Sequence, residues 1–225
     1  ICPEAAIVVR GIKPEASLDL SDGGLPTAAQ VELLMKGRRS FRFFKKEDIP
    51  RDQILRLLEL SNHAPTGGNR QGISFNAVYS SSEMGKFRER FYTLIEKAVS
   101  DKTLPEEGEF LANFAGGFRE GGNDVLFRDA PHVYFAVGPE DKPIIHTDGV
   151  IAATYFELAA FAFGYGALWN GFVVYAINNV PGLRDLIGLG PDEVVCYALC
   201  FGIPDITFQR TVQRNDIKAV ELKGF

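Results

Sequence analysis

The sequence predicts a single domain in which helices and strands are mixed. Stretches with helical periodicity alternate along the chain with short apolar stretches typical of strands, and no stretch repeats another. The chain has 225 residues, of which 46% are hydrophobic, so it is long enough to build one large domain with its own core. Such an alternation without an internal repeat indicates a mixed α and β fold.

The chain begins with a segment that we expect to be a tail or linker. Residues 1–26 are interrupted by prolines and glycines, which break regular structure. The domain itself is then expected over residues 27–225. Thr27 can cap a first helix, whose apolar residues recur at helical spacing until Gly37 ends it.

Three elements follow in the next third of the chain. A second helix opens at Pro50 and is expected to finish at His63, because Pro65 disfavours its continuation. Residues 74–79 alternate between apolar and polar side chains as a strand does. Residues 82–98 place their apolar side chains on one side, which predicts a longer amphipathic helix.

The middle of the chain is less regular. Residues 104–129 are rich in glycine and mixed in charge, and we expect a loop with a helical fragment. The bulky β-prone side chains of residues 131–138 predict a buried strand. A helix over residues 149–163 follows, and it is apolar around almost its whole circumference. One domain of this size covers only part of such a surface, so we expect a homodimer.

The last third of the chain contains three further elements. Residues 181–187 form a short helix in this interpretation, and residues 193–202 form another apolar strand. Near the end, residues 219–222 have the pattern of a final strand.

Charge and composition exclude several classes of partner. The net charge is −5, so no overall basic field favours a nucleic acid or an anionic membrane. Residues 149–166 contain one charged residue, Glu157, yet they fall short of the roughly 20 apolar residues of a spanning helix. The three cysteines form no even-numbered framework and the start is unlike a signal peptide, which favours a cytoplasmic protein.

A basic segment follows the first helix. Residues 37–43 read GRRSFRF, with Arg38, Arg39 and Arg42 close around the hydroxyl of Ser40. Three guanidinium groups so close together repel one another unless an anion lies among them, and the planar fork of arginine matches two phosphate oxygens at once. The alternative interpretation is a solvated basic face.

A tight turn forms the second unusual segment. Residues 64–71 read APTGGNRQ, in which small side chains and glycines surround the two amide side chains of Asn69 and Gln71. Such a turn can bring backbone N–H groups and amides close to a flat polar ligand. Alone it could be only a turn, but together with the arginines it indicates a phosphorylated, hydrogen-bonding cofactor.

In order along the chain, these motifs resemble those of the nitroreductase family of FMN-dependent oxidoreductases. The likeness includes residues 38–42, residues 64–71, the GYGALWNG stretch at 164–171 and the terminal pair Arg210 and Arg214. It covers about residues 27 to 225. The resemblance implies an α+β fold with a central, mostly antiparallel sheet wrapped by helices. It also implies an intertwined homodimer with two flavin sites at the interface.

The resemblance assigns the phosphate end of FMN to the arginines. Arg38, Ser40 and Arg42 would hold the phosphate and the ribityl chain, and Arg39 would lie against that chain or the pyrimidine edge of the ring. The phosphate site would be closed by Arg210 or Arg214.

The resemblance assigns the ring end to two other segments. Asn170 and Gly171 would place backbone N–H groups near the reactive nitrogen of the flavin, and Trp169 would pack on the ring or fill the core. The residues that would come from the partner subunit or cover the ring edge are Pro65, Thr66, Gly67, Asn69 and Gln71.

Function is expected to follow from the flavin, because no catalytic triad or carboxylate pair stands out. The leading hypothesis is electron transfer from NAD(P)H or a ferredoxin-type donor to a small acceptor such as a nitroaromatic or a quinone. The alternatives are a flavin-destroying or dehalogenating enzyme of the same fold, and a nucleotide-sensing module without turnover. The absence of a G-x-G-x-x-G loop favours FMN over FAD.

The remaining cysteines and histidines are interpreted as structural. Cys196 and Cys200 would share one face of an extended strand, too far apart for a disulfide. His63, His132 and His146 have no mutual spacing typical of metal ligands. The glycine-rich stretch also carries Phe110, Phe114 and Phe118, which could cover the flavin but are better explained by core or dimer contacts.

Cys2 is followed by Pro3, as is the last cysteine of a bacterial ferredoxin motif. One cysteine cannot hold a cluster. An iron–sulfur module would therefore require further cysteines upstream of Ile1, and a chance Cys-Pro pair is the alternative.

Overall fold

A four-stranded antiparallel sheet forms the centre of the protein in the computed structural model, which describes residues 17–20 and 23–223. Its strands are β1 (Ser74–Val78), β2 (His132–Pro139), β3 (Gly166–Trp169) and β4 (Glu193–Gly202), in the order β1-β2-β4-β3. Every neighbouring pair is antiparallel. The expected α+β class with a mostly antiparallel sheet is therefore confirmed.

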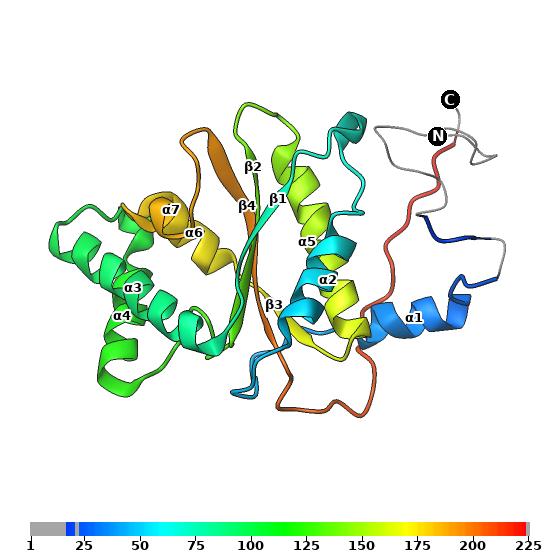
Figure 1. Cartoon of the computed structure of the whole chain (residues 1–225), viewed down its shortest axis with the longest axis horizontal. Helices are drawn as coiled ribbons and strands as arrows, with labels where there is room; N and C mark the ends of the chain where they lie inside the picture. The colour runs from blue at the N-terminus through cyan, green and yellow to red at the C-terminus, as the bar shows by residue number, and fades with distance from the viewer. Residues whose placement is uncertain (1–16, 21–22, 224–225) are drawn as a thin grey trace.

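Helices cover both faces of this sheet (Figure 1). One face is covered by α2 and α5, and the other by α3, α4, α6 and α7. The helices of the described part of the chain are α1 (Ala28–Gly37), α2 (Arg51–Ser61), α3 (Ser81–Ser100), α4 (Phe110–Gly121), α5 (Ile145–Ala162), α6 (Gly171–Asn179) and α7 (Leu183–Leu186), with short 3-10 turns η2 (Gly67–Asn69) and η3 (Glu106–Gly108).

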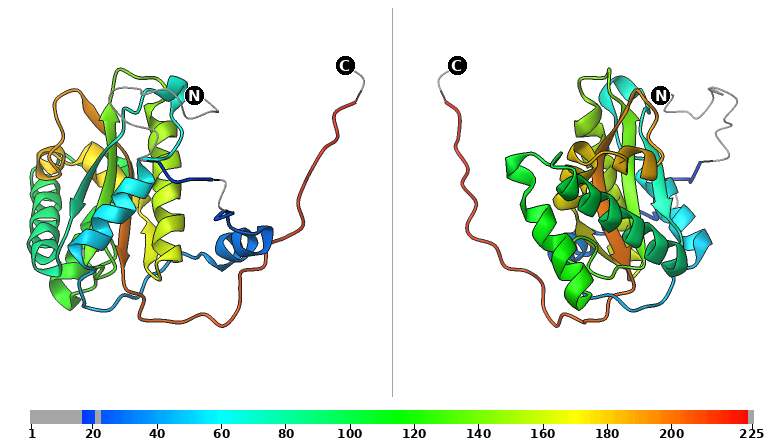
Figure 2. Two further views of the ribbon diagram at one scale, coloured as in Figure 1. Left: turned by 45° about the vertical axis from the view of Figure 1, so that its right-hand side comes forward. Right: turned by 90° about the vertical axis from the view of Figure 1, so that its left-hand side faces the viewer.

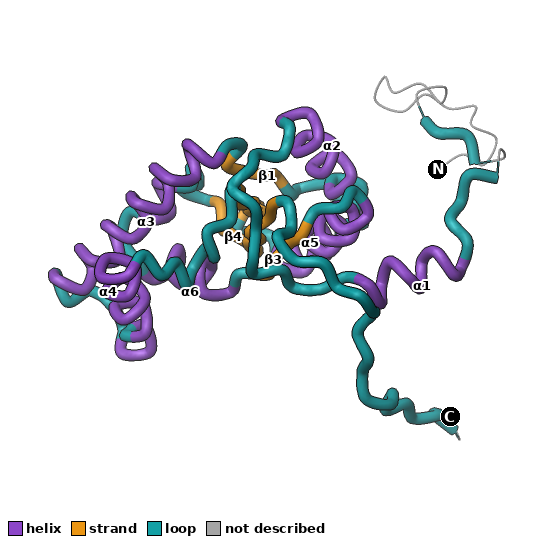
Figure 3. Tube along the Cα trace, turned by 90° about the horizontal axis from the view of Figure 1, so that it is seen from below, coloured by secondary structure: helices purple, strands orange, loops and turns teal. Residues whose placement is uncertain are grey.

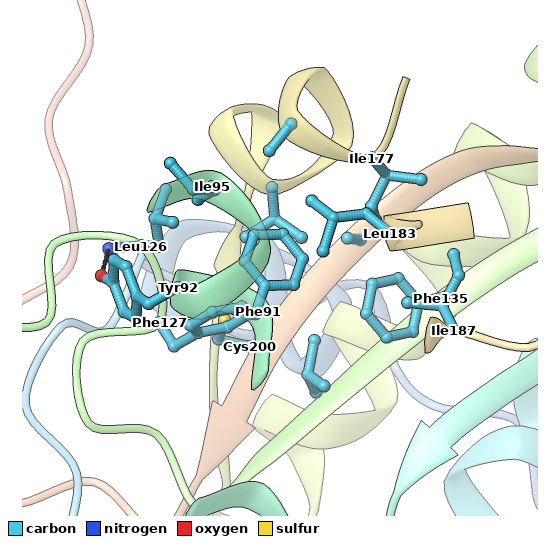
Figure 4. Close-up of a cluster of buried hydrophobic side chains, with 14 of the residues drawn as sticks. Phe91, Tyr92, Ile95, Leu126, Phe127, Phe135, Ile177, Leu183, Ile187 and Cys200 are labelled. Carbon is cyan, nitrogen blue, oxygen red and sulfur yellow. Dashed lines mark hydrogen bonds between the residues drawn. The ribbon is translucent and has the colours of Figure 1, made fainter. Parts of the chain in front are cut away.

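Each face of the sheet has its own hydrophobic core. The core on the α3 side contains several aromatic side chains, and Phe91 packs edge-on against Phe127 with ring centroids 5.0 Å apart (Figure 4). On the α5 side, Phe156 of the helix stacks on Tyr134 of β2 at 4.4 Å. Because α5 lies directly on the two central strands, its position is fixed by the core.

Two segments lie apart from this body. Helix α1 begins with a capping box between Thr27 and Gln30, but none of its residues is buried, and Leu33 and Met35 are 64% and 60% exposed. The C-terminal segment first pairs with the body, where Lys45 N–H donates to Ile203 O and Asp205 N–H donates to Phe43 O, and its last part, drawn in red in Figure 2, then extends away (Figures 2 and 3). A helix with an exposed apolar face lacks the tertiary packing from which most helical stability comes.

Several expectations about local structure need correction. The helical fragment expected within residues 104–129 is the twelve-residue helix α4, and α6 (Gly171–Asn179) has no counterpart among the expected elements. The expected strand at 219–222 is wrong, because those residues lie exposed without a strand to pair with. Helix α5 also begins earlier than expected, at Ile145. Helix α2 ends at Ser61, two residues before the expected His63.

Strand β4 carries a bulge that separates its two cysteines. The partners of β2 skip from Tyr197 to Val195 and leave Cys196 unpaired. The bulge reverses the side-chain alternation, so Cys196 joins the core on the α5 side and Cys200 the core on the α3 side. The expectation that they share a face is wrong, while both are free and buried as expected.

Candidate functional site

The arginine segment lines a pocket at the exit of α1. We call it the arginine pocket, and its volume is about 360 Å³. Backbone contacts place its walls: Phe41 N–H donates to Ala167 O at 3.0 Å, and Val212 N–H donates to Lys36 O at 3.0 Å. The residues that line it are Arg38, Arg39, Ser40, Arg42, Phe208, Val212 and Arg214. The structure thus brings the three predicted phosphate ligands of this segment, Arg38, Ser40 and Arg42, together with Arg39 and Arg214.

Arg38 is tied to a buried carboxylate. Its Nη1 donates to Oε1 of Glu157 at 2.9 Å, and the Glu157 side chain is 5% exposed. Glu157 belongs to α5, so the core helix fixes the direction of the Arg38 side chain. The pair leaves Arg38 with further N–H donors but neutralises its charge.

The other three arginines keep their charge. Arg39 Nη2 donates to the backbone oxygen of Arg210 at 2.6 Å, and its guanidinium lies 4.2 Å from the ring centroid of Phe208. Its Nε is buried without a hydrogen-bond partner among the described residues. Within the same part of the chain, Arg42 and Arg214 make no ion pair. An orphaned buried donor and three uncompensated cations fit a phosphate monoester, which carries roughly −1.5 to −2 charges at neutral pH.

Arg210 lies elsewhere. Its backbone oxygen accepts a hydrogen bond from Arg39, and Arg210 lines a neighbouring pocket of about 550 Å³ between α1 and the C-terminal segment instead of the arginine pocket. Of the two terminal arginines left open by the sequence, the geometry therefore favours Arg214 at the phosphate.

The second predicted segment, residues 64–71, forms an ordered turn that we call the glycine turn. Gln71 N–H donates to Thr66 Oγ1 at 3.0 Å, and Gln71 Nε2 donates to Asn69 Oδ1 at 3.3 Å. Gly68, Asn69 and Gln71 have φ angles of 61°, 51° and 52°, in the left-handed region. The turn is anchored to α5 by Gly67 N–H, which donates to Asp148 Oδ1 at 3.0 Å.

The two segments do not meet within one chain. Both attach to α5, the arginine pocket through Glu157 and the glycine turn through Asp148. Nine residues of helix separate these anchors by about 14 Å along the axis and by about two and a half turns, so they face opposite sides. In Figure 1 the cyan turn lies at the upper end of α5 and α1 lies at the lower end.

Asn170, directly after β3, has a different role from the one that the resemblance implied. Asn170 is 4% exposed, its backbone N–H donates to Ala198 O at 2.9 Å, and its side chain caps α6 by accepting from Val173 N–H at 3.2 Å. Its Nδ2 donates to Leu126 O at 2.5 Å. The proposed role of the Asn170 N–H is therefore corrected, since the fold already uses it. Gly171 stays exposed in the first turn of α6.

Trp169 is half-buried, and its ring lies edge-on to Tyr197 with centroids 4.7 Å apart. Pro65 is exposed at the start of the glycine turn. Phe110 and Phe114 lie on α4 rather than in a loop, and both contact Phe172, which follows Gly171. These rings form an aromatic wall beside the start of α6.

The thiols and histidines have structural surroundings. Burial raises the pKa of Cys196 and of Cys200 to about 12, which makes both thiols unreactive at neutral pH. His132 is buried, and its Nε2 accepts a hydrogen bond from Ile49 N–H at 2.9 Å. In the described part of the chain, no group of three or more His, Cys, Asp or Glu side chains could hold a metal. Cys2 lies outside the described residues.

Sequence reasoning missed two buried acids of the site, Asp148 and Glu157. A signal for Glu157 was present, because it is the one charge in the apolar stretch 149–166. Charged residues are almost never fully buried unless they are paired. None of the helices described is long and apolar enough to cross a membrane.

Comparisons with known proteins agree on one family. The model of the nitroreductase family matches residues 35–203. YfhC of Bacillus subtilis, provisionally named an NAD(P)H nitroreductase, is 30% identical over 162 residues, which cover 68% of this chain and 76% of YfhC. An iodotyrosine deiodinase from Hydra vulgaris is 23% identical over 201 residues, which cover 85% of this chain and 71% of the deiodinase.

Among solved structures, a nitroreductase from Bacteroides fragilis with bound FMN has the same fold. It superposes with a TM-score of 0.69 at 20% sequence identity, and the match covers 85% of this chain and 99% of that one.

Proposed function

Because this chain belongs to the nitroreductase family of FMN-dependent oxidoreductases, we propose that it acts as a homodimer holding FMN between two subunits. One subunit would supply the arginine pocket and its partner the glycine turn. The observation that carries this proposal is their separation: the two halves lie at different levels and on opposite sides of α5. A second copy related by a two-fold axis can supply the missing half.

At the phosphate end, the chain supplies charge and direction. Arg39, Arg42 and Arg214 offer uncompensated guanidinium groups, and Glu157 holds Arg38 in place beside them. Charge-assisted bonds from arginine to phosphate are short and often bidentate. Binding should therefore depend on the terminal phosphate.

At the ring end, the chain supplies hydrogen-bond donors. The amides of Asn69 and Gln71 are exposed on the glycine turn and are available to a polar ring edge. FMN, when bound, supplies the redox chemistry itself. Donors fixed beside its pyrimidine edge stabilise the negative charge of the reduced state without reorganisation.

We propose NAD(P)H or a ferredoxin-type centre as donor, and a nitroaromatic or quinone as acceptor. The name of YfhC supports NAD(P)H. Reductive dehalogenation is the second candidate, favoured by the relation to the Hydra vulgaris deiodinase. A nucleotide-sensing module without turnover would bind the cofactor but would not cycle it.

The first experiment measures FMN binding by fluorescence quenching in matched arginine variants. Arg214→Ala should weaken binding by about 1.5–3 kcal/mol, the range for a hydrogen bond to a charged group. Arg210→Ala is the control, because Arg210 lines the neighbouring pocket and not the arginine pocket. Equal losses in both variants would contradict the placement of the phosphate, and no FMN binding by the unaltered protein would contradict the proposed function.

A second experiment distinguishes the candidate reactions. The FMN-loaded protein is bleached anaerobically with NADH, with NADPH or with reduced ferredoxin, and its absorbance is followed after adding a nitroaromatic, a quinone or iodotyrosine. Recolouring by the first two acceptors supports the leading proposal, and recolouring by iodotyrosine alone supports dehalogenation. A flavin that no donor bleaches would indicate the sensing module.

The dimer is tested by sedimentation of the FMN-loaded protein. We expect a dimer at micromolar concentration, with the exposed apolar face of α1 covered by the partner. Leu33→Ser should weaken association with little effect on the fold of the monomer, because Leu33 is 64% exposed. Leu55→Ser on α2, at 47% exposure, is the matched control. A monomeric unaltered protein that binds FMN fully would refute the shared site.

A further inference from the structure

We propose that Asp148 is a positioning residue that holds the glycine turn in the conformation that meets the flavin ring. The inference rests on the proposed function, and it concerns a residue that does not line the arginine pocket. Asp148 would act through Gly67, the residue to which it is hydrogen-bonded.

The Asp148 carboxylate is buried with a single hydrogen bond. It is 3% exposed, and among the described residues its one side-chain partner is Gly67 N–H at 3.0 Å. Burying a carboxylate costs free energy unless it is compensated. Asp148 lies in the first turn of α5, where the helix dipole favours a negative charge. A charge in this place therefore gives the turn a fixed, charge-assisted anchor.

The turn needs such an anchor because its own bonds fix only its shape. Thr66 accepts hydrogen bonds from Asn69 N–H and Gln71 N–H at 2.9 and 3.0 Å. The left-handed backbone of Asn69 and Gln71 persists only where the surroundings determine it. In the part of the chain that the structure describes, Gly67 to Asp148 is the one hydrogen bond that links the turn to α5.

Packing restricts the same point from the other side. A Cβ atom at Gly67 would lie 2.9 Å from Cγ2 of Ile144, just before α5. The turn is thus held between the Asp148 carboxylate and the Ile144 side chain. Because Glu157 of the same helix fixes Arg38, α5 sets the positions of both halves of the site.

The test compares binding of FMN and of riboflavin, which lacks the phosphate, well below the unfolding temperature. Asp148→Ala should weaken both ligands by the same factor, about tenfold or more. Asp148→Asn should restore most of the affinity, because its amide oxygen can accept the Gly67 N–H. Arg214→Ala should weaken FMN alone. Asp141→Ala, an exposed acid in the loop before α5, is the control.

The outcomes separate this inference from the proposed function. An unaltered protein that binds neither ligand overturns the proposed function and the inference with it. An unaltered protein that binds FMN, with an unchanged Asp148→Ala variant, overturns the inference alone. An Asp148→Ala effect on FMN but not on riboflavin also overturns it, because the turn would then act at the phosphate.

A second pair of variants keeps the test valid if Asp148→Ala does not fold. Gly67→Ala forces the turn away from Ile144, so both ligands should bind more weakly. Adding Ile144→Ala removes the clashing methyl group, and affinity should return. Ile144 is 40% exposed, so its truncation leaves the core intact. Unchanged binding by Gly67→Ala would overturn the inference.

Discussion

Three carboxylates are buried in this protein's described core, and they differ in how fully they are satisfied. Asp124, on the α3 side of the sheet, accepts hydrogen bonds from Tyr92 OH, Phe127 N–H and Asp129 N–H at 2.8, 2.9 and 3.0 Å. Arg88 Nε forms an ion pair with Asp124 Oδ2 at 2.6 Å, the oxygen that also accepts from Asp129 N–H. Asp148 and Glu157, on the α5 side, each have one side-chain partner among the described residues.

The difference teaches what each acid does. The partners of Asp124 come from the core and from the loop that precedes β2, so this acid closes a network within the fold. The partners of Asp148 and Glu157 come from the two segments predicted to contact the cofactor. A fully satisfied buried network rigidifies the fold, so we expect Asp124 to stabilise the fold and Asp148 and Glu157 to orient the segments that they bond.

The largest effect on the free energy of unfolding should come from breaking the hydrogen-bond network around Asp124. Asp124→Ala leaves the Arg88 guanidinium, which is 15% exposed, without its counter-ion. Removing one partner of a buried ion pair typically costs about 3–5 kcal/mol, and we expect a loss of unfolding free energy in that range. Urea unfolding measures it. Asp205→Ala, an exposed acid, should stay within about 0.5 kcal/mol. A loss no larger than that of the control would refute the role assigned to Asp124.

A smaller effect is expected at Arg38, where substitution should change both FMN binding and the stability of the protein. Arg38→Ala should weaken FMN binding by about 1.5–3 kcal/mol and also destabilise the free protein, because Glu157 is left buried and unpaired. Adding Glu157→Gln removes the buried charge. Stability should then return in urea unfolding while FMN affinity stays low. If the double variant recovers both, Arg38 acts only through the fold.

Much of the fold followed from local patterns, and the failures have physical causes. Strand β4 begins and ends where its apolar pattern predicts, and the α1 capping box is readable at Thr27. Helix α4 was expected only as a helical fragment because its glycines lower helix propensity, while packing of its aromatic face against α3 compensates for them. The bulge at Cys196 depends on the neighbouring strand, which a single sequence does not display.

The parts of the candidate site that are local in sequence could be predicted, and the contacts between distant residues could not. Residues 38–42 and residues 64–71 are each a continuous segment of the sequence, so composition and turn chemistry reveal them. Their supports, Asp148 and Glu157, act across 81 and 119 residues of chain. The hydrogen bond of the Asn170 N–H could not be predicted either, because its acceptor, Ala198 O, lies in strand β4. Contacts at such separations become visible only in three dimensions.

The smallest expected effect concerns His132. It tests whether the role of a buried polar group depends on how many of its hydrogen bonds are made or on which face of the sheet it occupies. His132 is buried, and its ring lies tilted against Phe201 of the α5-side core with centroids 5.2 Å apart. Both of its ring nitrogens nevertheless have partners. Its Nε2 accepts from Ile49 N–H at 2.9 Å, and Nδ1 lies 3.3 Å from Val78 O. By the comparison above, His132 should stabilise the fold without affecting flavin binding.

The pH dependence of stability measures this role. Burial lowers the pKa of His132 below its usual 6.5, against the opposing effects of Val78 O and the Asp48 carboxylate. A lowered pKa means that the unfolded chain binds the proton more readily, so stability is full above about pH 6.5 and falls as the pH drops through the folded pKa. The slope reaches at most about 1.4 kcal/mol per pH unit. Urea midpoints between about pH 5 and 8 should show this slope in the unaltered protein and in His63→Gln, which changes an exposed histidine. In His132→Gln the slope should flatten, because an amide oxygen accepts the Ile49 N–H without titrating. An equal slope in His132→Gln would show that another group carries the acid sensitivity. A change in FMN affinity of this variant at neutral pH would contradict the expectation that a buried polar group with all its partners has a purely structural role.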